Sequence, residues 1–294
     1  MRRNGLLIQS PQGDFRIHPE CARSPEEIGV SDLVLIGLKT TANDRFADLL
    51  PPLVGPSTAV LTLQNGLGNE ESLAQLVSPD AILGGLCFVC LNRTEPGVIH
   101  HIDHGKVVLG EFQRPPQART HEIAEHFRQA GISCSVSDNL ALAHWEKLVW
   151  NVPFNGLGVA SAAGYEGFIS GKLPSALQPC LTTDKLLSDS CWESLVRDLM
   201  LEIIAAARAL GFSIPESLAN HQIERTRTMG AYKASTLIDF ERCQPLELHS
   251  LFLEPLRQAR ASGTKTPRLE TLCHVLTRLD AQRTRAGTSV ASAG

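Results

Sequence analysis

The chain has 294 residues, a formal net charge of −4 at pH 7 and a sequence pI near 6.2. This mildly acidic balance argues against a nucleic-acid-binding surface and against a polybasic membrane-binding surface. Hydrophobic residues make up 43% of the chain and charged residues 20%, as in globular proteins large enough for two domains. No apolar run approaches the roughly 20 residues of a membrane helix, and the start of the sequence lacks the apolar region of a signal peptide. These features predict a cytoplasmic protein.

The first half of the sequence alternates strand and helix patterns. The continuous apolar run at 31–39 is typical of a parallel strand that is covered on both faces, and the runs at 57–64 and 81–91 are predicted to be the next two strands. Turn residues predict one hairpin over 5–19 and a second hairpin around His104-Gly105. Together with helix patterns between these runs, they predict an α/β domain over residues 1–137.

From residue 138 the patterns are helical only. A long helix is expected after Asp189 or Ser190, with Gly211 just past its end. Residues 138–282 are therefore predicted to form an all-α domain, and the small, polar residues 283–294 are expected to be a disordered tail.

The eight cysteines are predicted to be free thiols of a reducing compartment, because they are scattered through a long chain. They are Cys21, Cys87, Cys90, Cys134, Cys180, Cys191, Cys243 and Cys273. The close pair Cys87 and Cys90 lacks the second pair that a zinc site would need. The histidines of VIHHIDHGK are interpreted as exposed hairpin residues, because no carboxylate–histidine cluster completes a coordination shell. No metal is expected.

The segment WEKLVWNVPFNG, residues 145–156, has the apolar content of a buried helix but carries a polar row. Lys147, Asn151 and Asn155 are spaced i, i+4 and i+8, which places an ammonium group and two amides on one stripe. Either Lys147 extends to the surface and the amides satisfy each other, or the stripe faces a functional cleft.

Two further polar residues end consecutive apolar strands. Lys39 ends the run at 31–39, and Asn65 follows the run at 57–64. Ligands of open parallel sheets bind at the carboxyl ends of the strands, although single loop residues are more often simply solvated. The following Gly66-Leu67-Gly68-Asn69-Glu70-Glu71 is not interpreted as a phosphate-binding loop, because Glu71 replaces its third glycine and would repel a pyrophosphate.

Five segments, in this order and spacing, resemble the ketopantoate reductase (2-dehydropantoate 2-reductase) family. They are residues 31–40, 60–71, 96–112, 145–157 and 235–272. The resemblance covers about residues 1–280. It implies a Rossmann-like parallel sheet domain that binds NADPH, followed by a helical domain of the 6-phosphogluconate dehydrogenase type, and often a homodimer.

The resemblance also implies roles for single residues. Lys147 matches the catalytic lysine, and Asn151, Asn155 and Ser235 match residues that bind the substrate. Lys39, Asn65 and Glu247 match residues near the cofactor. The implied reaction is hydride transfer from NADPH to the ketone carbon of a 2-oxo acid, with Lys147 stabilising and protonating the developing alkoxide.

One part of the family pattern is missing from the sequence. Family members begin with a strand and a GxGxxG turn, and about 50 residues of that pattern have no counterpart here. A start codon assigned to an internal methionine would account for this, as would a truncated chain. Three functions are therefore weighed: a ketopantoate-type reductase, a related 6-phosphogluconate or hydroxyisobutyrate-type dehydrogenase, and a non-catalytic remnant.

Overall fold

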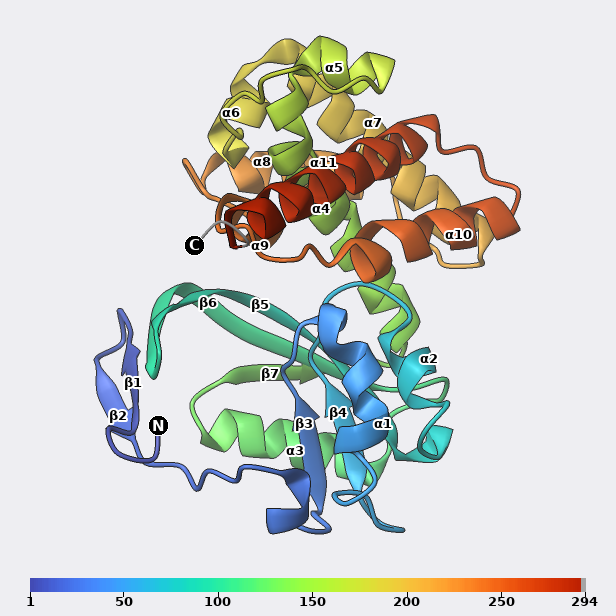
Figure 1. The fold of residues 1–294 in the computed structure, drawn as a ribbon. Helices are drawn as coiled ribbons and strands as arrows, with labels where there is room; N and C mark the ends of the chain where they lie inside the picture. Colours follow the sequence, from blue (N-terminus) through green and yellow to red (C-terminus); the bar gives the residue numbers. More distant parts are fainter. Residues whose placement is uncertain (292–294) are drawn as a thin grey trace. The chain divides into compact units, whose positions relative to one another are not determined.

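The structure is a computed structural model that describes the backbone of residues 1–291 and the side chains of residues 1–283. Its contacts divide the chain into two compact units (Figure 1). The first comprises residues 1–38, 42–64 and 69–141, and the second comprises residues 39–41, 65–68 and 142–294. The boundary after residue 141 lies four residues beyond the predicted one at 137. The class predicted from the sequence, an α/β part followed by an all-α part, is confirmed.

A seven-stranded mixed sheet forms the centre of the first unit. The strands are β1 Leu6–Gln9, β2 Phe15–Ile17, β3 Leu33–Ile36, β4 Ala59–Thr62, β5 Ile82–Glu95, β6 Val98–Glu111 and β7 Ser133–Val136. Their order is β2-β1-β6-β5-β4-β3, with β7 also paired to β6. The pairs β3–β4 and β4–β5 are parallel, whereas β1–β2 and β5–β6 are antiparallel. The carboxyl ends of β3 and β4 therefore lie at the same edge.

Short helices cover the two faces of this sheet. They are α1 Phe46–Leu49, α2 Asn69–Leu73 and α3 Ala118–Gln129, with single 3₁₀ turns at Pro25–Glu27, Thr40–Arg45 and Pro79–Ala81. Alternate residues of β4 point to opposite faces, so Val60 packs with Phe46 and Leu73 on one side, whereas Leu61 packs with Ile123 on the other.

Two details of the predicted strands are wrong. The run at 31–39 is not covered on both faces, because β3 is an edge strand of the sheet and Leu33 and Leu35 are 36% and 48% exposed. His104-Gly105 is not a hairpin turn. Both residues have positive φ, and the register between β5 and β6 shifts there, so they form a β-bulge within the continuous strand β6.

Helices build the second unit around one apolar core (Figure 1). They are α4 Leu140–Ala160, α5 Tyr165–Ser170, α6 Thr183–Ser188, α7 Ser190–Ala209, α8 Ser217–Arg227, α9 Ser235–Glu241, α10 Glu254–Ala261 and α11 Pro267–Ala291, with a 3₁₀ turn at Ser161–Ala163 and a π turn at His249–Leu253. The predicted cap of α7 is confirmed, since the Asp189 carboxylate accepts hydrogen bonds from the amides of Cys191 and Trp192.

The last helix extends into the predicted tail. The backbone of α11 continues as a helix to Ala291, and no proline after Pro267 interrupts its hydrogen bonds. Residues 292–294 of the predicted tail lie outside the described residues.

A buried carboxylate at the end of β6 supports the first unit. The Glu111 side chain is fully inaccessible and accepts hydrogen bonds from Arg119 at 2.6 Å, Arg114 at 3.1 Å and Thr120 at 2.5 Å. Burial alone would raise the pKa of Glu111, but the hydrogen bonds and charge of Arg119, with those of Thr120 and Arg114, lower it below its ordinary value near 4.5.

This carboxylate predicts an acid-sensitive contribution to stability. A folded-state pKa below the unfolded one contributes stability that is present above about pH 4.5 and is lost as the pH falls through the folded value. Glu111→Gln should lower the free energy of unfolding by about 2 kcal/mol at pH 7, the magnitude of a lost charge-assisted hydrogen bond. The difference from wild type should shrink in urea melts below pH 4. A difference that is constant with pH would contradict this role.

Candidate active site

The polar row of α4 lies on the helix as its spacing predicts. Lys147 is partly buried, and its Nζ donates a hydrogen bond to Oδ1 of Asn65 at 2.7 Å. Asn65 follows β4 but belongs by its contacts to the helical unit. Thus an ammonium group from the helix and an amide from the end of a sheet strand, 82 positions apart, are brought together.

The two asparagines of the row differ in their partners. Asn151 is 7% exposed, and its side chain makes no hydrogen bond within the described part of the chain. Asn155 is 3% exposed, and its Oδ1 accepts hydrogen bonds from the Ser235 hydroxyl at 3.2 Å and the Thr236 amide at 3.1 Å. Asn155 therefore fixes the first turn of α9 and, with it, Ser235.

Lys39 forms an ion pair that the sequence analysis missed. Its Nζ contacts Oδ1 of Asp239 on α9, and the side chains are 48% and 12% exposed. Asp239 lies four residues after Ser235, so both occupy one face of α9. That spacing was a signal that could have singled out Asp239, because Ser235 was already a candidate residue.

The side chain of Glu247 contacts the loop that carries Lys39 at a backbone amide. Its Oε1 accepts a hydrogen bond from the amide of Thr40 at 2.8 Å, and the residue is only 8% exposed. Ser250, one turn later, donates its hydroxyl to Oγ1 of Thr40 at 3.1 Å and accepts the Leu67 amide at its carbonyl at 2.9 Å. Thr40 and Ser250 were not expected from the sequence.

The glycine-containing turn after β4 packs closely on this segment. Gly66 has φ +89°, and a Cβ at that position would lie 2.3 Å from the Ser250 carbonyl oxygen. The absence of a side chain at Gly66 therefore allows its backbone to approach the backbone of Ser250 closely. A turn that packs against Ser250 in this way, followed by a helix of only five residues (α2), does not resemble a phosphate-binding loop.

The remaining chemistry of the described residues is limited. All eight cysteines are free, as predicted. Residues 1–283 contain no group of three or more His, Cys, Asp or Glu side chains that could hold a metal ion. Within the same described residues, no helix combines the length and the apolarity that crossing a membrane requires.

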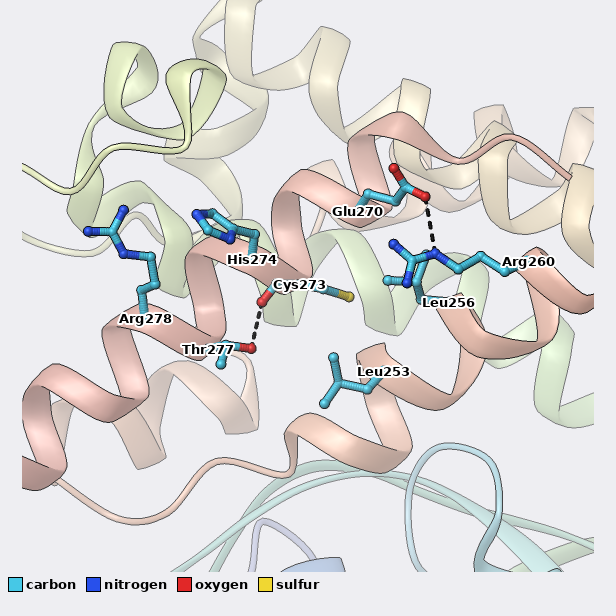
Figure 2. Close-up of a pocket in the computed structure, with 8 residues that line it drawn as sticks. All are labelled: Leu253, Leu256, Arg260, Glu270, Cys273, His274, Thr277 and Arg278. Carbon is cyan, nitrogen blue, oxygen red and sulfur yellow. Dashed lines mark hydrogen bonds and ion pairs between the residues drawn. The ribbon is translucent and has the colours of Figure 1, made fainter.

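A cavity of about 270 Å³ lies between α10 and α11, and its lining includes none of the predicted site residues. Figure 2 shows that an ion pair between Arg260 and Glu270, at 3.2 Å, lies at this cavity, with Cys273 beside it. Burial raises the pKa of the Cys273 thiol to about 12, so the thiol stays protonated and is a poor nucleophile. We do not assign catalysis to this cavity.

Comparison with known proteins identifies the family. The model described as "Ketopantoate reductase PanE/ApbA" matches residues 1–114, and its C-terminal counterpart matches residues 174–280. A 2-dehydropantoate 2-reductase from Nostoc sp. is 36% identical over 98% of this chain and 86% of its own length. The chain belongs to the ketopantoate reductase family.

Solved structures of relatives agree with this assignment. The chain is similar to the crystal structure of 2-dehydropantoate 2-reductase from Geobacter metallireducens, with 43% identity, a TM-score of 0.85 and coverage of 95% of this chain and 87% of that chain. It is also similar to the enzyme from Methylococcus capsulatus, with 30% identity, a TM-score of 0.82 and coverage of 96% and 86%. The family consists of nicotinamide-dependent oxidoreductases with a Rossmann-like domain and a helical domain.

Proposed function

We propose that this family member reduces the ketone of a 2-oxo acid with NADPH, and that its substrate is 2-dehydropantoate, which is converted to pantoate for pantothenate biosynthesis. The observation that carries the proposal is the hydrogen bond between Lys147 and Asn65. It joins the one ammonium of the α4 polar row to the loop at the carboxyl end of a parallel strand, the position at which open α/β sheets bind ligands.

The residues of the two strand-end loops fit the nicotinamide end of such a cofactor. Asn65 supplies an amide that can contact a carboxamide or ribose, and Lys39 supplies a half-exposed cation suited to phosphate. Glu247 contributes indirectly, by holding the amide of the residue after Lys39. The chain contains no GxGxxG sequence, so these residues support only that part of the cofactor site.

Lys147 would perform the proton chemistry. The reduced nicotinamide supplies a hydride to the carbonyl carbon, and negative charge develops on the ketone oxygen. The Lys147 ammonium stabilises that charge and transfers one proton to the oxygen, so that the ketone becomes a secondary alcohol. Asn65 orients the ammonium through its Oδ1, which restricts the rotation of a long side chain.

The substrate carboxylate would bind at Ser235 and the α4 asparagines. Asn151 is buried, and its amide is not committed to any described residue, so it can donate to a substrate oxygen. Ser235 now donates to Asn155 and would turn its hydroxyl toward the carboxylate, while the Thr236 amide continues to donate to Asn155. The start of α9 would thus keep its position during binding.

We further propose a cytoplasmic enzyme, in keeping with its free cysteines. A homodimer is proposed from the resemblance alone.

The proposal predicts selective binding and turnover. The 294-residue chain should bind NADPH in the micromolar range, about −8 kcal/mol. It should oxidise NADPH with 2-dehydropantoate faster than it reduces NADP⁺ with 6-phosphogluconate-type or hydroxyisobutyrate-type substrates. Fluorescence titration and a substrate panel measure both properties. Binding without turnover of any 2-oxo acid would argue for a non-catalytic protein, and preferred turnover of a hydroxy acid would favour the related dehydrogenases.

A further inference from the structure

The π turn His249–Leu253 begins two residues after Glu247, and its central residues Ser250, Leu251 and Phe252 are buried in the helical unit. π turns insert one residue into a helix and often occur at functional sites. Here the turn directs both the hydroxyl and the carbonyl of Ser250 toward other segments of the same unit. The hydroxyl contacts the 39–41 loop and the carbonyl contacts the 65–68 loop.

Thr40 is held at two points. Its amide donates to Glu247 at 2.8 Å, and its hydroxyl oxygen accepts the Ser250 hydroxyl at 3.1 Å. Ser250 is 2% exposed and Glu247 is 8% exposed, so water competes little for these contacts. Because Thr40 is bonded covalently to Lys39, this double attachment limits where the Lys39 ammonium can lie.

The second loop is held by the same residue. The Leu67 amide donates to the Ser250 carbonyl, and Leu67 itself is buried in the helical core. Asn65, two residues earlier, is then restricted at one side by Ser250 and at the other by Lys147. One buried serine thus links the two loops that carry Lys39 and Asn65.

We infer that Ser250 is a positioning residue that aligns the Lys39 and Asn65 loops for cofactor binding. The inference rests on the proposed function, since it assumes that these loops contact NADPH. Ser250 need not touch the cofactor. Its effect is to raise the fraction of molecules whose loops are in the binding-competent arrangement, and the apparent dissociation constant varies inversely with that fraction.

Removing the hydroxyl link tests the inference in NADPH titrations. Ser250→Ala and Thr40→Val should each raise the NADPH dissociation constant by about fivefold, the size of one net hydrogen bond. The double variant should be no weaker than either single one, because both remove the same bond. Thr40→Ser keeps the hydroxyl and should bind as wild type does. Ser262→Ala is the matched control, since its hydroxyl bonds only to the end of α10 and to Thr264.

Hydrogen exchange supplies a measurement that needs no ligand. Amide exchange at Thr40 should accelerate about fivefold in Ser250→Ala and not in Ser262→Ala, because only Ser250→Ala removes the hydroxyl that holds Thr40. Exchange at Leu67 should stay unchanged, because alanine keeps the backbone carbonyl that accepts the Leu67 amide. Additive effects of Ser250→Ala and Thr40→Val, or unchanged exchange at the Thr40 amide, would overturn the inference even if the enzyme is active. If exchange accelerates in Ser250→Ala but the wild-type chain binds no NADPH, the proposed function is refuted and the loop-positioning role stays intact. A loss of unfolding free energy without a change in exchange or binding would show that Ser250 is merely structural.

Discussion

Lys147→Ala should lower kcat for 2-dehydropantoate reduction by about 10³-fold, within the range expected for removing a general acid that also stabilises developing charge. The ammonium is held at 2.7 Å from the Asn65 amide oxygen, so its position is already set before substrate binds. Because neither Trp145 nor Leu148 changes, the core beside it should remain intact. Steady-state kinetics and urea melts of the same preparation measure the two effects separately.

The control for this variant is another lysine of the helical unit. Lys265 is exposed and lies in the turn before α11. Lys265→Ala should therefore leave kcat unchanged and keep the free energy of unfolding within about 0.5 kcal/mol of wild type. Lys147→Met would retain the length of the side chain without its charge and should be as inactive as the alanine variant. Turnover of Lys147→Ala within a few-fold of wild type would remove Lys147 from the mechanism.

Gly66→Ala should have the second-largest effect on activity, because the added methyl group would overlap the backbone of Ser250. Its Cβ would lie 2.3 Å from the Ser250 oxygen and 2.4 Å from the carbonyl carbon, and neither atom can rotate away. The loop must therefore move, which breaks the hydrogen bond from Leu67 and displaces Asn65. We expect a loss of about 2–3 kcal/mol of unfolding free energy and about a 10²-fold drop in kcat/KM, as for misplaced catalytic groups.

Gly68→Ala separates steric overlap from backbone strain. Gly68 has φ +87°, close to the +89° of Gly66, but a Cβ there would meet only the Glu254 side chain, with Cγ at an ordinary 3.5 Å and Cδ at 3.9 Å. It should therefore cost about 1 kcal/mol, from the positive φ alone. Equal losses of activity in the two variants would mean that the close approach to Ser250 is not what positions the loop.

Helices and their caps could be predicted from the sequence where neighbouring residues alone determine them. The polar row of α4 follows from spacing alone, and the α7 cap follows from Asp189 and the apolar pattern after it. The error at His104-Gly105 arose because positive φ serves a β-bulge as well as a turn, and only the partner strand distinguishes them. Likewise, the exposure of Leu35 depends on the place of β3 in the sheet.

The candidate residues were predicted better than their partners. The family resemblance singled out Lys147, Asn155 and Glu247, but it did not indicate that Asn155 caps α9 or that Glu247 holds a backbone amide. Thr40 and Ser250 were missed because their contact joins segments 210 positions apart. Such pairs leave no periodic pattern in a single sequence, since only the tertiary fold brings them together.

The central claim is that the Lys147–Asn65 arrangement serves reduction of a 2-oxo acid. The most direct test is a single-turnover experiment in which the wild-type chain, saturated with NADPH, is mixed with excess 2-dehydropantoate and the loss of NADPH absorbance is followed. The account predicts one NADPH oxidised per chain with formation of one pantoate, and a rate constant about 10³-fold lower in Lys147→Ala. No oxidation by the wild-type chain, or equal rates in the two proteins, would contradict it.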